Sequence, residues 1–174
     1  MLKLRVTNET DRLKAVILGT AVSNGATPTL EEAYDPKSAE HIKAGTYPIE
    51  KDMVAEMDAF AAVLQKYGVQ VYRPEIIRDC NQIFPRDIGF VIDDVFIKAN
   101  ILPDRQAEFQ AIEYIVKQMN PDKVVTPPEE VHIEGGDVMP WNEHIFIGTY
   151  KGDDYKEQVT ARTNMAVYSK TLPS

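Results

Sequence analysis

Apolar residues recur at helical and strand spacings in alternating stretches of the chain. They return every three to four positions between residues 53 and 64, and again between residues 109 and 119, which predicts two amphipathic helices. Gly68 follows the first stretch as an expected C-cap. Short β-rich segments come next, at residues 69–72 and 123–125. This alternation of helix and strand indicates the α/β class.

Two stretches 50 residues apart align without a gap, and each predicts a β-hairpin. Asp87–Ile97 and Asp137–Ile147 both begin with an Asp that we expect to open the first strand, and both end on an apolar triplet. The polar pairs Asp93-Asp94 and Asn142-Glu143 are the expected turns. Together with the preceding helix and strand, each hairpin completes one repeating unit.

The repeat is expected to be incomplete at both ends of the chain. Ala15–Thr20 resembles the return strand Ile145–Thr149, so the chain begins partway through a unit. A further helix is expected near Asp153, but no strand or hairpin pattern follows it before Ser174. The last unit is therefore expected to be cut short.

Length and composition predict a single partial domain over residues 1–174. A chain of 174 residues with 44% hydrophobic content can bury one substantial core. Residues 19–47 contain several Gly and Pro residues and predict a long loop with one short helix around Leu30–Ala33.

The acidic balance of the chain argues against two classes of partner. The net charge is −8, and no Lys/Arg run is long enough to follow a phosphate backbone, so neither nucleic acid nor an anionic membrane is expected to bind. The single cysteine, Cys80, excludes an intramolecular disulfide and fits a reducing compartment. No stretch approaches the roughly 18 apolar residues of a membrane span. We expect a soluble cytoplasmic protein.

Three carboxylates stand at the starts of the predicted hairpins. Asp87 and Asp137 open them, and Glu134 precedes Asp137 across Gly135-Gly136. In the simplest structural interpretation each Asp caps a turn and the glycines form a bulge. If the repeats instead stack around an axis, the three carboxylates line a common acidic mouth with no balancing base.

A guanidinium suits such a mouth better than a metal ion does. Its N–H groups form a planar fork that one or two carboxylates can bind. The three histidines, His41, His132 and His144, form no pair with the spacing of a metal site. We therefore expect no metal and no cofactor, and an arginine-like small molecule as the partner.

Two segments resemble the N-terminal signatures of the guanidino-group-modifying enzymes, namely the amidinotransferases, arginine deiminases and dimethylarginine dimethylaminohydrolases. They are Asn81–Asp87 (NQIFPRD) and His132–Asp137 (HIEGGD). The resemblance implies a pentein-type fold, an α/β propeller of five ββαβ units, of which about three are present here. Pro85 stands where deiminases usually have Thr, which favours the amidinotransferase branch.

The resemblance also implies roles for individual residues. Asp87 would bind the substrate guanidinium, and Asn81 and Phe84 would line the pocket. Glu134 would serve catalysis by orienting the catalytic His or would bind the guanidinium itself, and Arg162 would hold the substrate carboxylate. Asp137, from the residue pattern, is expected to join Asp87 and Glu134 as a guanidinium ligand.

The chain departs from the family in its catalytic groups. The family has a catalytic His-x-Asp in the fourth unit and a nucleophilic Cys near the end of the fifth. We expect neither in this chain, and the position of Cys80 matches no family nucleophile. We therefore expect the N-terminal part of an amidinotransferase-like enzyme that acts on arginine or a related guanidine compound and is inactive alone.

Other interpretations remain open at this point. The alternatives are a non-catalytic guanidinium-binding module, a remnant that forms homo-oligomers through its open propeller edges, and a fragment of a deiminase-type or dimethylargininase-type hydrolase. A separate polypeptide that completes the site is a further possibility.

Overall fold

The computed structural model describes residues 1–33, 36–101 and 105–149, which form three small sheets and their covering helices. In the parallel pair, β1 (Ala15–Ile17) lies beside β2 (Gln70–Tyr72). The central sheet contains β3 (Gly89–Ile92), β4 (Val95–Lys98) and β5 (Val124–Val125). The third sheet is the hairpin of β6 (Val138–Trp141) and β7 (His144–Ile147). The helices are α1 (Pro36–Ala44), α2 (Glu50–Lys66), α3 (Pro85–Ile88), α4 (Ala107–Gln110) and α5 (Glu113–Val116), with 3-10 turns η2 (Pro121–Lys123) and η3 (Gly135–Asp137).

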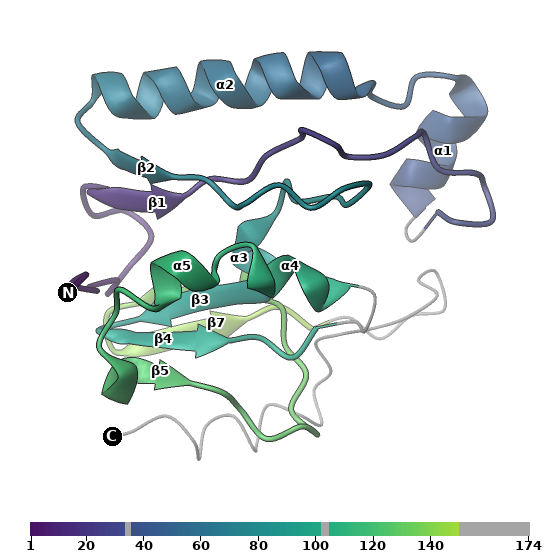
Figure 1. Ribbon diagram of the computed structural model, residues 1–174. Coiled ribbons are helices and arrows are strands. Elements are labelled where there is room, and N and C mark those ends of the chain that lie inside the picture. Colours follow the sequence, from purple (N-terminus) through teal and green to yellow (C-terminus); the bar gives the residue numbers. More distant parts are fainter. Residues whose placement is uncertain (34–35, 102–104, 150–174) are drawn as a thin grey trace.

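Along the chain, the elements follow the predicted order of helix, strand and hairpin (Figure 1). Both hairpins form, and their turns fall at the predicted pairs of residues. The strand pair β1–β2 and the pair β4–β5 are both parallel, and in each a helical segment joins the two strands. The strand Ala15–Ile17 is thus the counterpart of a hairpin's return strand, as its sequence predicts.

The two hairpins are related by 49 positions rather than the 50 of the ungapped alignment. The main-chain hydrogen bonds that extend the hairpins run from Ala99 to Ile88 and from Gly148 to Asp137. Asp137 therefore corresponds to Ile88, and Asp87 lies one position earlier. The prediction that the two aspartates occupy equivalent places is wrong. Asp87 stands one residue further from the start of its strand than Asp137 does, and an ungapped alignment cannot detect such a shift.

The central sheet is buried on both faces. Phe96 belongs to a cluster with residues of α5 and its flanks, including Ile112 and Ile115. Its neighbour Ile97 belongs to a second cluster, with Val131 and residues of β3 and β6, because successive strand residues point to opposite faces. The segment that leads to Glu134 is thus packed into the core, which fixes where that carboxylate lies.

Two of the predicted helices need correction. The stretch 109–119 is divided between α4 and α5, because the carbonyl of Ala111 accepts a hydrogen bond from Glu75 N and is taken out of the helical ladder. Leu30–Ala33 forms only a turn, and the helix of this loop begins later, at Pro36. Proline favours the first turn of a helix. The predicted helix over 53–64 is confirmed as α2, and Gly68 follows it at φ +76°.

The N-terminal segment joins the turns of the two hairpins. Val6 and Asp93 exchange hydrogen bonds of 2.8 and 2.7 Å, and Asn142 N donates to Thr7 O at 2.8 Å. Asp93 and Asn142 both have φ of 53°, a conformation that Asp and Asn tolerate better than most residues. Across the described ranges, none of the helices is long and apolar enough to cross a membrane.

Candidate functional site

Two short helical turns carry the predicted carboxylates. Asp87 lies in α3, the short helix that runs directly into β3, and Glu134 directly precedes η3. Asp87 N donates to Phe84 O, and Asp137 N donates to Glu134 O, both at 3.1 Å. The expectation that Asp87 opens a strand is therefore wrong, because its backbone is helical and the strand begins at Gly89.

The glycine pair allows α3 and η3 to touch. A Cβ atom at Gly135 would lie 2.1 Å from the carbonyl oxygen of Arg86, and one at Gly136 would lie 2.7 Å from Asp87 Oδ1. Neither glycine has a positive φ. They are thus needed for close approach rather than for the sharp bend predicted from the sequence.

Arg86 of α3 forms hydrogen bonds that link α3 to η3 and to the start of β6. Its Nε donates to Gly135 O at 3.0 Å and its Nη2 donates to Val138 O at 2.6 Å. The guanidinium also forms an ion pair with Glu9 at 2.6 Å. Because Arg86 precedes Asp87, these bonds hold the Asp87 carboxylate beside Glu134.

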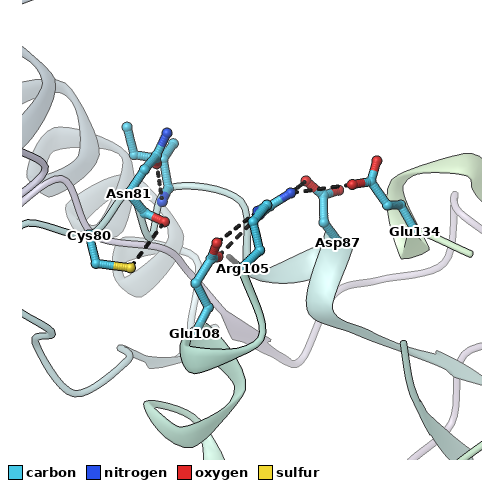
Figure 2. A network of polar contacts seen from close by, with 7 residues as sticks. Cys80, Asn81, Asp87, Arg105, Glu108 and Glu134 are labelled. Carbon is cyan, nitrogen blue, oxygen red and sulfur yellow. Dashed lines mark hydrogen bonds and ion pairs between the residues drawn. The ribbon is translucent and has the colours of Figure 1, made fainter. Parts of the chain in front are cut away.

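The guanidinium of Arg105 lies among three carboxylates (Figure 2). Its Nη1 donates to Asp87 Oδ2 at 3.1 Å and to Glu134 Oε1 at 3.4 Å. Its Nε and Nη2 donate to the two oxygens of Glu108 at 2.7 and 3.1 Å. The predicted carboxylates Asp87 and Glu134 do converge, but the expectation of a mouth without a balancing base is wrong.

The third carboxylate of this cluster is Glu108, which the sequence analysis missed, and not Asp137. Glu108 is only 4% exposed, and its spacing from Arg105, three residues along the chain, was the available signal. Asp137 Oδ1 lies beside Gly148 instead, 3.2 Å from where a Cβ would stand. That Asp137 serves as a guanidinium ligand stays a prediction.

Burial and excess negative charge set the protonation of the cluster. Burial raises the pKa of Glu134, and the charge of Asp87 raises it further. Burial also raises the pKa of Glu108, although Arg105 acts in the opposite direction. Burial alone would lower the pKa of Arg105, but its bonds to Glu108 and Asp87 more than compensate and raise it. Arg105 is therefore charged, and one cation faces three acids.

Cys80 lies near this cluster, close to Glu108 (Figure 2). Burial raises the pKa of its thiol and Glu108 raises it further, while Arg105 partly offsets both. The nucleophilic form of cysteine is the thiolate. These surroundings therefore favour the unreactive thiol.

Of the remaining predicted residues, Asn81 and Phe84 are not among the hydrogen-bond partners of Arg105. Asn81 is exposed and its Oδ1 accepts a hydrogen bond from the main chain two residues on, at 3.1 Å. Phe84 is 57% exposed. Arg162 and the helix expected near Asp153 lie outside the described residues. Their predicted roles stay predictions.

Gln82, between these signature residues, has a structural role that the sequence did not reveal. Its side chain is buried; the oxygen accepts from Ile77 N at 2.8 Å and the nitrogen donates to Glu75 O at 2.9 Å. It thereby shapes the loop that carries Asn81.

Among the described residues, no group of three or more His, Cys, Asp or Glu is placed to hold a metal ion.

Several solved structures are similar in fold to this chain. SxtG, an amidinotransferase of the saxitoxin pathway from Microseira wollei, superposes with a TM-score of 0.69 at 20% identity, over 95% of this chain and 58% of that one. The inosamine-phosphate amidinotransferase StrB1 of Streptomyces griseus gives 0.60 at 23% identity, over 80% and 53%. The DDAH of Pseudomonas aeruginosa, solved with citrulline, gives 0.57 at 19%, over 91% and 57%.

These comparisons confirm the predicted fold class. No protein-family model and no curated protein matches the sequence. This chain spans little more than half the length of the proteins that it superposes on. The described residues thus have part of the pentein fold, the fold of the amidinotransferases and dimethylarginine dimethylaminohydrolases.

Proposed function

We propose that this chain binds the guanidinium group of arginine or a related compound, as the N-terminal part of an amidinotransferase-like enzyme. One observation carries the proposal: Asp87 and Glu134 already accept hydrogen bonds from a guanidinium, that of Arg105. Carboxylates can also bind a guanidinium bidentately, and that pairing is selective for a planar fork of donors. The same two carboxylates come from segments that resemble the family signatures.

Further residues are proposed to contribute to the ligand site beside Asp87 and Glu134. Asp137 adds negative charge, since its carboxylate helps to raise the pKa of Glu134, after burial and Asp87. Asn81 and Phe84 are proposed to line the entrance from the loop before α3. Arg162 is proposed to hold the ligand carboxylate. The Pro85 of the first signature favours the amidinotransferase branch over the hydrolases.

The proposed role of this chain alone is binding without turnover. The family reaction starts when a thiolate attacks the guanidinium carbon and an amine leaves with a proton from a histidine. Cys80 is the chain's one cysteine, and burial followed by the charge of Glu108 raises the pKa of its thiol, which disfavours the nucleophilic thiolate. The covalent step therefore needs a nucleophile from elsewhere.

Calorimetric titration with L-arginine tests the proposal. We expect saturable binding that Asp87→Ala abolishes, with no citrulline, ornithine or urea in the same samples. Asp58→Ala is the matched control, because it removes the same charge from an exposed position on α2. A folded wild-type chain that does not bind L-arginine would refute the proposal, and product formation would refute the binding-only role.

A second candidate function is self-association through the β6–β7 hairpin. Four large apolar side chains of this hairpin are between 38% and 57% exposed: Met139, Trp141, Ile145 and Phe146. At the corresponding positions of β4, Phe96 and Ile97 are almost fully buried, at 2% and 1%. Exposed apolar patches of this kind often mark contacts between proteins.

A further inference from the structure

The two edges of the Arg105 guanidinium have different partners. The Nε/Nη2 edge faces Glu108 and forms two hydrogen bonds with it, whereas Nη1 alone reaches Asp87 and Glu134 (Figure 2). Arg105 therefore joins one buried carboxylate to the pair that the proposed function assigns to the ligand.

We propose that Arg105 is a displaceable internal guanidinium, which occupies the ligand's place between Asp87 and Glu134 and gives it up while it stays paired with Glu108. This inference rests on the proposed function. It makes Arg105 an intramolecular competitor that sets the affinity of the site and the threshold concentration of ligand that fills it.

The hydrogen-bond lengths support displacement from Asp87 and Glu134 rather than from Glu108. The bonds to Glu108 measure 2.7 and 3.1 Å and share one edge of the guanidinium. The bonds to Asp87 and Glu134 measure 3.1 and 3.4 Å and both use Nη1. Bidentate pairs are the stronger arrangement, so the contacts of Nη1 are the ones that break first.

The charges of the cluster favour the exchange. With Arg105 in place, three carboxylates share one positive charge, so the arrival of a second cation reduces the repulsion among them. A ligand guanidinium can offer several N–H groups to Asp87 and Glu134, where Arg105 offers only those of Nη1. Arg105 then neutralises Glu108, which would otherwise be a buried charge without a partner.

Competition of this kind predicts the direction in which the affinity for the ligand changes when Arg105 is removed. The apparent dissociation constant of a ligand is raised in inverse proportion to the fraction of molecules in which the competitor leaves the site open. Removing Arg105 should therefore tighten the binding of L-arginine. A charge-assisted hydrogen bond at the lower end of the usual range of strength corresponds to a change of about tenfold.

We would titrate L-arginine into the wild-type chain and into Arg105→Gln, Arg105→Lys and Arg78→Gln by calorimetry. Arg105→Gln should bind about tenfold more tightly than wild type. Arg105→Lys keeps the charge but lacks the fork that spans Glu108 and Asp87, so it should also bind more tightly. Arg78→Gln removes the same charge from a side chain that is 92% exposed, and it should match wild type.

Glu108→Gln tests the second half of the inference. Without its buried carboxylate partner, Arg105 should hold Asp87 and Glu134 more firmly, so L-arginine should bind more weakly than to wild type. Thermal unfolding of each variant identifies those that fold. Tighter binding by folded Glu108→Gln would show that Glu108 does not retain Arg105 and would overturn the exchange.

The remaining outcomes separate this inference from the proposed function. If wild type binds, Asp87→Ala does not, and both Arg105 variants bind no more tightly than wild type, Arg105 is not a competitor and only this inference fails. If tightening in Arg105→Gln is matched by Arg78→Gln, net charge explains it and the inference also fails. If no folded variant binds L-arginine, the proposed function fails together with the inference.

Discussion

At the scale of single residues, the raised pKa of Glu134 makes the cluster sensitive to pH. Burial, followed by the charge of Asp87, raises this pKa above the ordinary value of 4.5. A carboxyl group whose pKa is higher in the folded state stabilises the fold fully below its ordinary pKa, and this contribution is lost as the pH rises through the folded-state value. The ionised form of Glu134 therefore costs stability near neutral pH.

Glu134→Gln should reveal this cost. The amide has a similar shape but cannot ionise, so the variant should gain free energy of unfolding relative to wild type as the pH rises from about 4 to about 7. Urea denaturation at both pH values measures the difference. Glu130→Gln, at an exposed position, controls for the loss of net charge. A difference between Glu134→Gln and wild type that does not depend on pH would contradict the assigned shift.

Gln82 is a second residue whose effect can be predicted from its contacts. Gln82→Leu should lower the free energy of unfolding by about 1–3 kcal/mol, because Ile77 N and Glu75 O would lose their partner. Chemical denaturation measures the loss. Gln110→Leu, on the exposed side of α4, should change stability little. Equal stability of the two variants would mean that water replaces the Gln82 amide.

Residue-level chemistry was only partly predictable from the sequence. Asp87 and Glu134 stand out because each adjoins a predicted hairpin, and the structure brings them together. Glu108 and Arg105 lie just before the helix predicted over residues 109–119, and their contacts depend on tertiary packing. The burial of Gln82 was equally hidden, since glutamine is mostly an exposed residue.

At the scale of elements, the contact between α3 and η3 determines the geometry of the site, and the two glycines test it separately. Gly135→Ala places a Cβ 2.1 Å from a backbone oxygen of Arg86, whereas Gly136→Ala meets the movable carboxylate of Asp87 at 2.7 Å. Gly135→Ala should lower the free energy of unfolding by about 1–3 kcal/mol or more. Gly136→Ala should weaken the binding of L-arginine and change stability less.

Denaturation and calorimetry on the same two variants check this pair of effects. The contrast between backbone and side chain is the informative result, because both substitutions add the same methyl group. If Gly136→Ala destabilised the fold as strongly as Gly135→Ala, the Asp87 carboxylate would be fixed too rigidly to move aside.

Element order followed from the sequence more completely than element boundaries did. The two hairpins, and the similarity of Ala15–Thr20 to the return strand of a hairpin, were visible as internal repeats. The break between α4 and α5 was not, because it depends on Glu75, which is distant in the sequence from Ala111. The one-residue difference between the hairpins was also hidden, since both Asp residues fit an ungapped alignment.

At the scale of the whole molecule, the β6–β7 hairpin differs from β3–β4 in what covers it. Ile145 is 38% exposed and Phe146 57%, whereas their counterparts Phe96 and Ile97 lie under α5 and against β6 and its flanks. The self-association alternative predicts that copies of the chain cover this surface. Burying such side chains stabilises an interface by roughly 25 cal/mol per Å² of apolar area, before the costs of association.

Sedimentation at increasing protein concentration tests this alternative. Wild type should shift from monomer to a larger species, and Phe146→Asp should remain monomeric over the same range. Phe60→Asp is the matched control and should associate like wild type, because Phe60 is 50% exposed on α2, a helix that lies apart from β7 (Figure 1). If wild type is a monomer at every concentration, self-association fails, and a hairpin that stays exposed would then favour completion of the site by another polypeptide.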